Sequence, residues 1–343
     1  MKAVVLAGVG DLRLETVPDP QLSQAGDALV RVTRTGLCGA DLFPFHGHTP
    51  GFEDGTVLGH EFVGVVEAVG PAVTSLTRGD RVVSTSTISC GACAHCRAGR
   101  PSQCLSRALF GYSGVYERLD GGQAELVRVP FAERSLFVVP DAVSDDAAVF
   151  VADMLPTGYN AVKRAELEQG DVAVVLGCGT VGLMAILFAR RVARRVIAVD
   201  GIESRRALAA SLGAEAVAPE DAAAAVEDAT DGLGADGVIE AAGAPAALTA
   251  AMSMVRGLGT VSVVGAHFEP DFPLNNALMF EREMTLRVTW GHPFKDRERI
   301  LAMIAEGTLD PLPAVTHRFA LAEAQEAYRV FDNREAVKVL LSP

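Results

Sequence analysis

The second half of the chain alternates short apolar runs with longer segments in which apolar residues recur at helical spacing. The run at residues 172–176 predicts a buried strand, residues 181–192 predict a helix, and residues 196–199 predict another strand. Strands that alternate with helices form a parallel sheet, so we predict an α/β unit with a doubly wound parallel sheet. Further strands are expected at residues 236–240, 260–264 and 284–289, and further helices at residues 205–212, 246–256 and 295–306.

The first 140 residues follow a different pattern, in which short apolar segments are separated by turns rich in Gly, Asp and Pro. Such spacing is typical of a strand-rich unit. At 343 residues the chain is long enough for two domains. Strands are expected at residues 3–6, 12–16 and 28–35 and on the β-branched run within residues 59–70. Helices are expected at residues 141–151 and 322–331.

A glycine-rich turn follows the strand at residues 172–176, with Gly177, Gly179 and Gly182 in the spacing G-x-G-x-x-G. Gly177 allows a tight turn, Gly179 lets a pyrophosphate approach the backbone, and Gly182 lets the helix pack closely on the strand. The helix N-terminus offers free N–H groups to the phosphates. Asp200 ends the next strand, where a carboxylate accepts hydrogen bonds from the adenosine ribose and repels a 2′-phosphate. The pattern favours NAD over NADP; the alternative is a glycine-rich turn in an ordinary α/β domain.

Four of the six cysteines, Cys90, Cys93, Cys96 and Cys104, lie within 15 residues. Four thiolates at this spacing can complete a tetrahedral zinc shell and leave no position for a catalytic water. We predict a structural zinc site, with disulfides or unliganded thiols as the alternatives. His95, inside this lobe, is expected to face solvent.

Cys38 follows the end of one predicted strand, and His60 lies at the start of another. Both are good zinc ligands, and together they leave coordination positions open for a substrate. The alternative is a buried thiol beside a hydrogen-bonded histidine. Asp153 lies in an otherwise apolar stretch, where a carboxylate is costly to bury without a partner. A metal is one such partner, and a helix N-cap is the alternative.

The chain carries 30 basic and 43 acidic residues, for a formal charge of −13. This charge argues against nucleic acid or an anionic membrane as a partner. Apolar runs are too short for a membrane span, and the N-terminal apolar run is too short for a signal peptide. We therefore expect a cytoplasmic protein, and in such a reducing compartment the clustering of four cysteines favours metal over disulfides.

In combination, these motifs resemble those of the zinc-containing medium-chain alcohol dehydrogenases, in particular their bacterial alcohol and polyol branch. The resemblance implies a GroES-like β-barrel catalytic domain from residues 1–154 together with residues 291–343. It also implies a Rossmann NAD-binding domain from residues 155–290, with the active site between the two. A small alcohol or carbonyl substrate and a homodimer or homotetramer are expected. The resemblance rests on Cys38-Gly-x-Asp41, Gly59-His60-Glu61, the four-cysteine lobe, Asp153 with Thr157-Gly158, the Gly177 turn and Ala336-Val337-Lys338-Val339.

The resemblance also implies roles for single residues. Cys38, His60 and Asp153 match the ligands of a catalytic zinc, distinct from the structural one, and Glu61 matches a neighbour that binds the zinc when its coordination changes. Asp41 matches a carboxylate that orients the zinc-bound imidazole, and Lys338 matches a basic residue close to both carboxylates. In the family, Thr157 would lie beside the nicotinamide and Arg205 would cover the adenine end. The expected cofactor-binding residues are Thr157, Gly177, Gly179, Thr180, Val181, Gly182, Asp200, Arg205, Gly265 and Trp290.

One departure from the family concerns the route of the alcohol proton. The family usually has Ser or Thr two residues after the zinc cysteine, and often a histidine three residues further on; here these are Ala40 and Phe43. Neither side chain can carry a proton. Water, Glu61 or a histidine of the next loop (His46 or His48) can replace the relay in an alcohol dehydrogenase. The alternatives are an NADH-dependent reductase of conjugated carbonyls or imines, and a nucleotide-binding protein without turnover.

Overall fold

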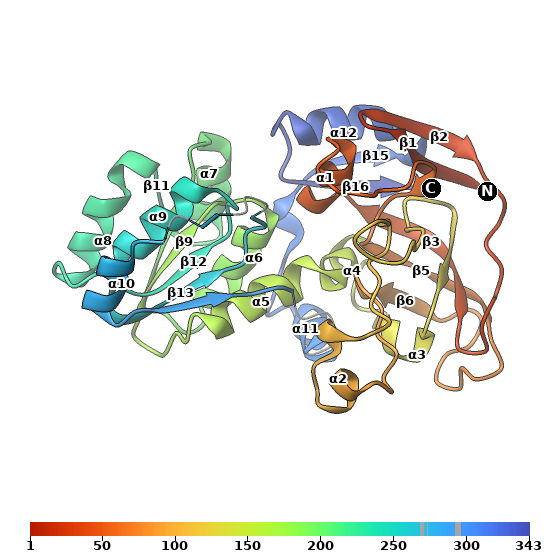
Figure 1. The fold of residues 1–343 in the computed structure, drawn as a ribbon, viewed down its shortest axis with the longest axis horizontal. Coiled ribbons are helices and arrows are strands. Elements are labelled where there is room, and N and C mark those ends of the chain that lie inside the picture. The colour runs from red at the N-terminus through yellow and green to blue at the C-terminus, as the bar shows by residue number, and fades with distance from the viewer. Residues whose placement is uncertain (268–270, 273, 292–295) are drawn as a thin grey trace. The chain divides into compact units, whose positions relative to one another are not determined.

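A computed structural model describes residues 1–267, 271–272, 274–291 and 296–343 (Figure 1). The chain divides into two compact units. The first consists of Met1–Asp153 with Pro293–Pro343, and the second is Met154–His292.

The second unit is built on a six-stranded parallel sheet in the order β11-β10-β9-β12-β13-β14. From the central strand β9 the chain first adds strands on one side and then on the other. This order confirms the predicted doubly wound sheet. The strands are β9 (Val172–Leu176), β10 (Arg195–Val199), β11 (Glu215–Val217), β12 (Ala235–Glu240), β13 (Val255–Val263) and β14 (Thr285–Val288). The helices are α5 (Met154–Arg164), α6 (Thr180–Ala189), α7 (Glu203–Ser211), α8 (Ala222–Thr230), α9 (Pro245–Met254) and α10 (Asn276–Arg282).

Two glycines set the sharp connection from β9 to α6. Gly177 has a φ of +92°, a left-handed conformation that favours glycine. A Cβ on Gly182 would lie 1.8 Å from the carbonyl oxygen of Gly177, which no other residue can tolerate. The first turn of α6 therefore packs directly against the end of the strand before it.

The sequence pattern placed one boundary in this unit incorrectly. The predicted helix at residues 246–256 ends at Met254, and β13 begins at Val255. Val255 is fully buried and pairs with Ala235 of β12, while Arg256 binds Asp236 of β12 at 2.6 Å. Tertiary pairing with β12 thus overrides the helical spacing.

The first unit contains a seven-stranded sheet in the order β15-β16-β3-β5-β6-β8, with β7 paired to β3, and a three-stranded sheet in the order β2-β1-β4. Strand β16, at the C-terminus, lies between β15 and β3, so the last segment of the chain joins a sheet that is otherwise built largely from residues 28–138. The strands are β1 (Lys2–Gly8), β2 (Asp11–Thr16), β3 (Ala28–Gly36), β4 (Thr56–Val57), β5 (Phe62–Val69), β6 (Arg81–Ser84), β7 (Leu126–Val129), β8 (Leu136–Val138), β15 (Val315–Ala320) and β16 (Lys338–Ser342).

Short helices cover this unit. Ser144 caps α4 by accepting a hydrogen bond from the backbone N–H of Ala147, and acidic residues fill the first turn, as the helix dipole favours. Lys295, where one helix was predicted to begin, lies outside the described residues. Across the described residues, no helix has the length and apolar character needed to cross a membrane. The helices are α1 (Leu42–Phe45), α2 (Ala94–Arg97), α3 (Ala132–Ser135), α4 (Asp145–Ala152), α11 (Arg297–Ala305) and α12 (Ala324–Asp332).

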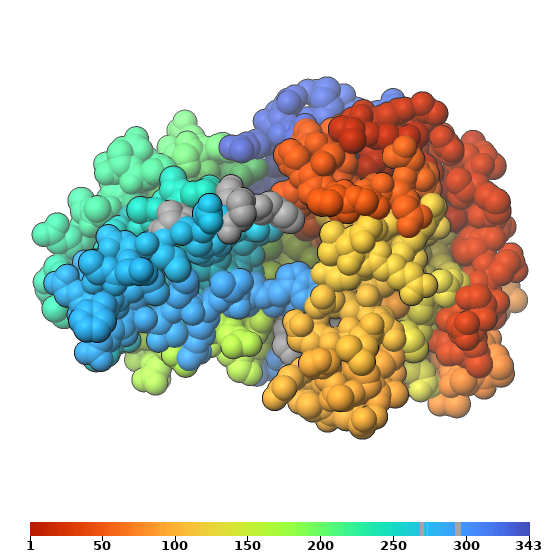
Figure 2. All heavy atoms as spheres, in the orientation of Figure 1, coloured from red at the N-terminus to blue at the C-terminus, as the bar shows by residue number. Residues whose placement is uncertain are grey.

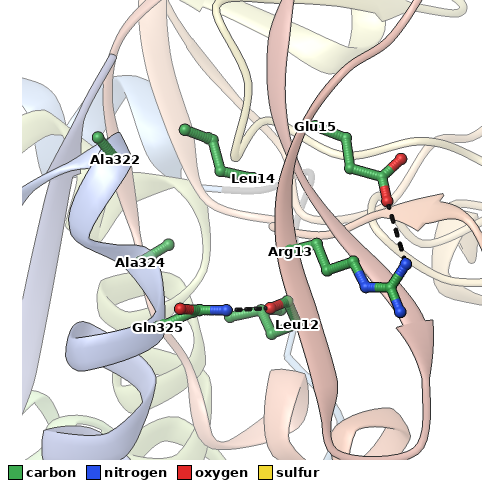
Figure 3. Close-up of a pocket in the computed structure, with 7 residues that line it drawn as sticks. All are labelled: Leu12, Arg13, Leu14, Glu15, Ala322, Ala324 and Gln325. Atoms are coloured by element: carbon green, nitrogen blue, oxygen red, sulfur yellow. Dashed lines mark hydrogen bonds and ion pairs between the residues drawn. The ribbon is translucent and has the colours of Figure 1, made fainter.

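Helix α12 packs against the N-terminal hairpin, and the two lie side by side at the top of Figure 2, α12 in blue and the hairpin in red. Gln325 of α12 donates a hydrogen bond to the carbonyl oxygen of Leu12 at 2.8 Å (Figure 3). Beside this contact lies a cavity of about 390 Å³. None of the predicted site residues lines it.

Candidate functional site

Four side chains that can bind a metal lie together in the first unit. The ligand atoms of Cys38, His60, Glu61 and Asp153 all lie within 4.8 Å of one another. Cys38 follows β3, and Asp153 follows α4. The pair His60 and Glu61 directly precedes β5 and is buried, whereas the other two residues are half-buried. The fold therefore brings three distant segments to one cluster that keeps some access to solvent.

Asp41 fixes the orientation of the His60 ring. One carboxylate oxygen of Asp41 lies 3.0 Å from His60 Nδ1, and the other accepts the backbone N–H of Cys38 at 2.9 Å. The opposite ring atom, Nε2, faces Asp153 at 3.6 Å. A carboxylate on one imidazole nitrogen leaves the other nitrogen as a metal ligand.

Glu61 is paired with a lysine from the far end of the chain. Lys338 of β16 donates to Glu61 Oε2 and to the carbonyl oxygen of Leu37, and both charged side chains are completely buried. A Cβ on Gly36 would meet Glu61 Oε2 at 2.5 Å and Lys338 Nζ at 2.8 Å. Glycine at position 36 therefore makes room for the ion pair beneath the cluster.

The electrostatics of the cluster fit a divalent cation. Desolvation by burial raises the pKa of the Cys38 thiol, and the charge of His60 acts in the opposite direction. Desolvation also raises the pKa of Glu61, which the charge of Lys338 lowers. Glu61 Oε1 is buried and has no hydrogen-bond partner among the described residues. A metal would lower both pKa values and give this oxygen a partner. Thiolate, imidazole and carboxylate are the ligand types that zinc takes.

The positions of these side chains bear on three alternatives from the sequence: Asp153 as an N-cap, Cys38 and His60 as a thiol beside a hydrogen-bonded histidine, and His46 as a proton relay. Asp153 stands at the C-cap of α4, and its carboxylate lies among the other ligand atoms. Cys38 and His60 are not an isolated thiol and a separate histidine, because two carboxylates share their site. His46, one of the suggested relays, binds Asp332 of α12 at 2.9 Å.

The four cysteines of the lobe also form a cluster. Cys90, Cys93, Cys96 and Cys104 bring their sulfur atoms within 4.8 Å of one another, and all four are free thiols. The backbone N–H groups of Leu105 and Cys96 lower the pKa of Cys93 to about 6. A thiolate is the form that binds zinc. His95 lies in α2, outside this cluster.

In the second unit, most of the predicted cofactor-binding residues lie at one edge of the parallel sheet. Loops at the carboxyl ends of neighbouring parallel strands meet at the same edge, where ligands bind in such sheets. A Cβ on Gly179 would point into open space, so the backbone there is accessible. Gly177 and Gly179 follow β9, Thr180, Val181 and Gly182 open α6, Asp200 follows β10, Gly265 follows β13 and Trp290 follows β14.

Asp200 is held by two backbone groups. Its Oδ2 accepts the N–H of Cys178 and its Oδ1 accepts the N–H of Ile202, both at 2.8 Å. Each carboxylate oxygen can accept a second hydrogen bond. The carboxylate is therefore fixed beside the glycine-rich turn and can still accept from hydroxyl groups.

Thr157, Arg205 and Trp290, the other residues discussed from this unit, differ in their burial and contacts. Thr157 is buried in α5, which packs against α6. Arg205 lies in α7, and its buried Nε has no hydrogen-bond partner among the described residues. Trp290 is 45% exposed, and its carbonyl oxygen accepts from Asn160 of α5 at 3.2 Å.

Sequence reasoning missed two polar features near these sites. Glu240 ends β12, fully buried, and binds His267 at 2.9 Å as well as the backbone N–H of Ala242 and Gly243. An acid at the end of a strand is the same signal that identified Asp200. Tyr112 is buried and donates to the carbonyl oxygen of Ala40, a contact for which the sequence gives no signal.

Comparisons with known proteins agree with this geometry. Residues 24–141 match the family model of the alcohol dehydrogenase GroES-like domain, and residues 180–306 match that of zinc-binding dehydrogenases. The medium chain reductase/dehydrogenase ucsI of Acremonium sp is 41% identical over 78% of this chain and 94% of that protein. The chain belongs to the zinc-containing medium-chain dehydrogenase family. The predicted family and fold class are thereby confirmed.

Other members of the family match along the whole chain. An uncharacterized zinc-type alcohol dehydrogenase-like protein, AdhB of Bacillus subtilis (strain 168), is 34% identical over 100% of both chains. The solved structure of alcohol dehydrogenase TADH from Thermus sp. ATN1 is 40% identical, with a TM-score of 0.95 over 100% of this chain and 99% of that one. As a member of this family the protein is an oxidoreductase that uses zinc and a nicotinamide cofactor.

We predict that replacing one lobe cysteine removes one zinc per chain. Cys96→Ser leaves three thiolates and a poorer oxygen ligand. The melting temperature should fall by roughly 5 °C or more, since a structural metal contributes several kcal/mol to folding. Metal analysis after dialysis and a thermal melt give the two readouts.

His95→Gln serves as the matched control, because His95 lies in the same lobe but outside the cysteine cluster. It should keep the zinc content of the parent protein. Equal zinc content in Cys96→Ser and the parent would contradict a four-cysteine site.

Proposed function

We propose that the protein is an NAD-dependent zinc dehydrogenase that interconverts an alcohol or polyol and the matching carbonyl compound. The cluster of Cys38, His60, Glu61 and Asp153 supports this proposal most directly. Unlike the four-cysteine lobe it mixes a thiol, an imidazole and carboxylates, one of which, Glu61, is already paired with Lys338, and part of the cluster remains accessible. A purely structural zinc has a closed shell, whereas a catalytic zinc keeps a position for substrate.

In this proposal Cys38, His60 and Asp153 hold the zinc. Bound there, zinc would act as a Lewis acid on the alcohol or carbonyl oxygen. Asp41 keeps His60 in the tautomer that presents Nε2, and Lys338 neutralises Glu61. The glycine-rich turn and the first turn of α6 would hold the pyrophosphate of the nucleotide, whose nicotinamide would supply the hydride chemistry.

A second candidate function follows from the residue at position 40. Ala40 has no hydroxyl group, and the nearest phenol, Tyr112, donates to its carbonyl oxygen. The family's usual proton relay is therefore missing. Reduction of a conjugated carbonyl or an imine involves no alcohol proton, and it remains the alternative activity to be tested beside alcohol oxidation.

We predict that the zinc-loaded protein reduces NAD⁺ with members of a panel of primary alcohols, secondary alcohols and polyols, followed by absorbance at 340 nm. His60→Ala should lower kcat/KM by about 100-fold or more, because a Lewis-acid metal contributes several kcal/mol to the barrier reduction. Ala40→Ser should leave alcohol oxidation unchanged or raise it modestly, since water or a nearby side chain already carries the proton.

His95→Gln is the control for the loss of a histidine outside the cluster. A large gain in alcohol oxidation with Ala40→Ser would count against the enal and imine reductase. Activity of the parent with enals or imines and NADH, but with no alcohol, would favour that reductase instead. Binding of NADH without turnover on any substrate would support a nucleotide-binding protein that has lost activity.

The proposed preference for NAD rests on Asp200. We predict that Asp200→Gly lowers the ratio of kcat/KM for NAD⁺ over NADP⁺ by at least about tenfold, because it removes a charge that repels the 2′-phosphate. Asp200→Asn removes the charge but keeps the shape of the side chain and one oxygen that can accept a backbone N–H, so it distinguishes the effect of charge from that of shape. A parent protein that already prefers NADP⁺ would show that this role of Asp200 is wrong.

We further propose that the protein is a homodimer or homotetramer assembled through the β14 edge of its parallel sheet. Large apolar side chains are exposed on β14, on its neighbour β13 and on α10, which packs against β13: Val288 is 73% exposed, Leu258 70% and Phe280 87%. An open strand edge with apolar neighbours is a ready pairing surface.

Val288→Asp should therefore shift the sedimenting species to a smaller assembly. Val9→Asp is the matched control, because Val9 is 72% exposed but lies in the other unit. A parent protein that sediments as a monomer would contradict the proposal.

The compartment is proposed from the same thiols that suggest zinc. All six cysteines are free, and four of them lie close together. Thiols so placed stay reduced and bind metal in a reducing compartment. We propose the cytoplasm on this ground.

A further inference from the structure

Arg297 is a buried cation that the proposed reaction does not use. Its side chain is 1% exposed and is among the largest fully buried side chains of the protein. It lies at the first position of α11, where the helix dipole disfavours a positive charge. A guanidinium in such a place requires compensation from its surroundings.

Hydrogen bonds supply little of that compensation. Arg297 Nη2 donates to the carbonyl oxygen of Ala152 at 2.5 Å, whereas Nε and Nη1 have no partner among the described residues. The guanidinium also lies 5.7 Å from the centre of the Phe137 ring, a favourable contact for a cation. One hydrogen bond and one ring do not account for burying a full charge.

The charge that compensates Arg297 is a ligand of the proposed zinc. Ala152, the acceptor of Arg297, directly precedes Asp153, and α11 packs against α4. Burial lowers the pKa of Arg297 to about 9, while the Asp153 carboxylate raises it. The guanidinium therefore stays charged at neutral pH and is held by the residue adjoining that carboxylate.

The carbonyl oxygen of Ala152 also accepts a second hydrogen bond. The backbone N–H of Ser86 donates to Ala152 O at 3.1 Å. Two donors from separate segments thus fix the turn at which Asp153 leaves α4, with backbone angles of −147° and −58°. The turn sets where the carboxylate of Asp153 lies.

The charges of the cluster give an independent reason for a cation at this place. Lys338 and Arg297 are both fully buried. Cys38, Glu61, Asp153 and Asp41 would carry negative charge when zinc is bound, with His60 neutral. Two buried cations balance half of those four charges, and a divalent metal balances the other half. Without Arg297 the loaded site would carry one uncompensated negative charge.

We propose that Arg297 is a positioning residue of the catalytic metal site: it holds the Ala152–Asp153 turn and supplies, through space, the counter-charge of Asp153. This inference rests on the proposed zinc ligands. Arg297 acts through Asp153 and touches neither zinc nor substrate in this role.

The test measures zinc affinity directly, by competition with a chelator of known affinity, and needs no turnover. The zinc of interest is the one that Cys38→Ser lacks and Cys96→Ser retains. Arg297→Met should weaken its binding by about 10- to 100-fold, the usual effect of losing a partner of a metal ligand. Arg297→Lys keeps the charge and should recover most of the affinity, and the lobe zinc should be unchanged in both.

Arg299→Met, an exposed position on the same helix, is the matched control. In an Asp153→Asn background, Arg297→Met should weaken binding less than it does in the parent, because the charge that Arg297 compensates is already absent and only its hold on the turn is lost; a merely structural role would weaken binding equally in both backgrounds. If Arg297→Met does not fold, Arg297→Gln replaces it.

Parent-like affinity in the folded Met or Gln variant would overturn the role of Arg297 while leaving the zinc site intact. A parent protein that binds only the lobe zinc would overturn the proposed function, and this inference with it.

Discussion

Carboxylates and a thiol can be buried side by side only where positive charge is buried with them. In the first unit this constraint governs the region around His60. Lys338 is completely buried against Glu61, and Asp41 takes one nitrogen of His60. The negative charge that the protein's own cations leave uncompensated equals the charge of one divalent metal ion.

Glycines make that arrangement possible in two places. Gly36 leaves the space that the ion pair of Glu61 and Lys338 occupies. Gly59 adopts a φ of +97°, and a Cβ there would collide with Gln123. The chain can therefore turn sharply just before His60 and still enter β5. The conformational freedom of glycine at these positions therefore serves to position the proposed ligands and does not make a loop flexible.

The sequence predicted those features that depend on local pattern. Alternating strands and helices indicated the parallel sheet, and the spacing of Gly177, Gly179 and Gly182 located its central turn. The cysteine lobe was predictable because its ligands lie within 15 residues of one another. The start of β13 was placed wrongly, because pairing with β12 decides it and no local signal records that pairing.

Counter-charges were harder to predict than ligands for the same reason. Cys38, His60 and Asp153 belong to residue types that bind metals, so each suggests its chemistry without a structure. Lysine and arginine are ordinary surface residues in a sequence, and only burial shows that Lys338 and Arg297 are different. Resemblance to a family indicated Lys338, but nothing in the pattern of α11 indicated Arg297.

The origin of these two cations explains why the first unit is discontinuous in sequence. All the proposed ligands of the catalytic metal come from residues 38–153, yet both buried cations come from the last 50 residues, beyond the whole parallel-sheet unit. Lys338 reaches Glu61 because β16 pairs with β3, whose end carries Cys38. Such long-range pairing costs loop entropy that local contacts do not. The return of the chain therefore does more than complete a sheet, since it places the positive charge of Lys338 against the buried carboxylate of Glu61.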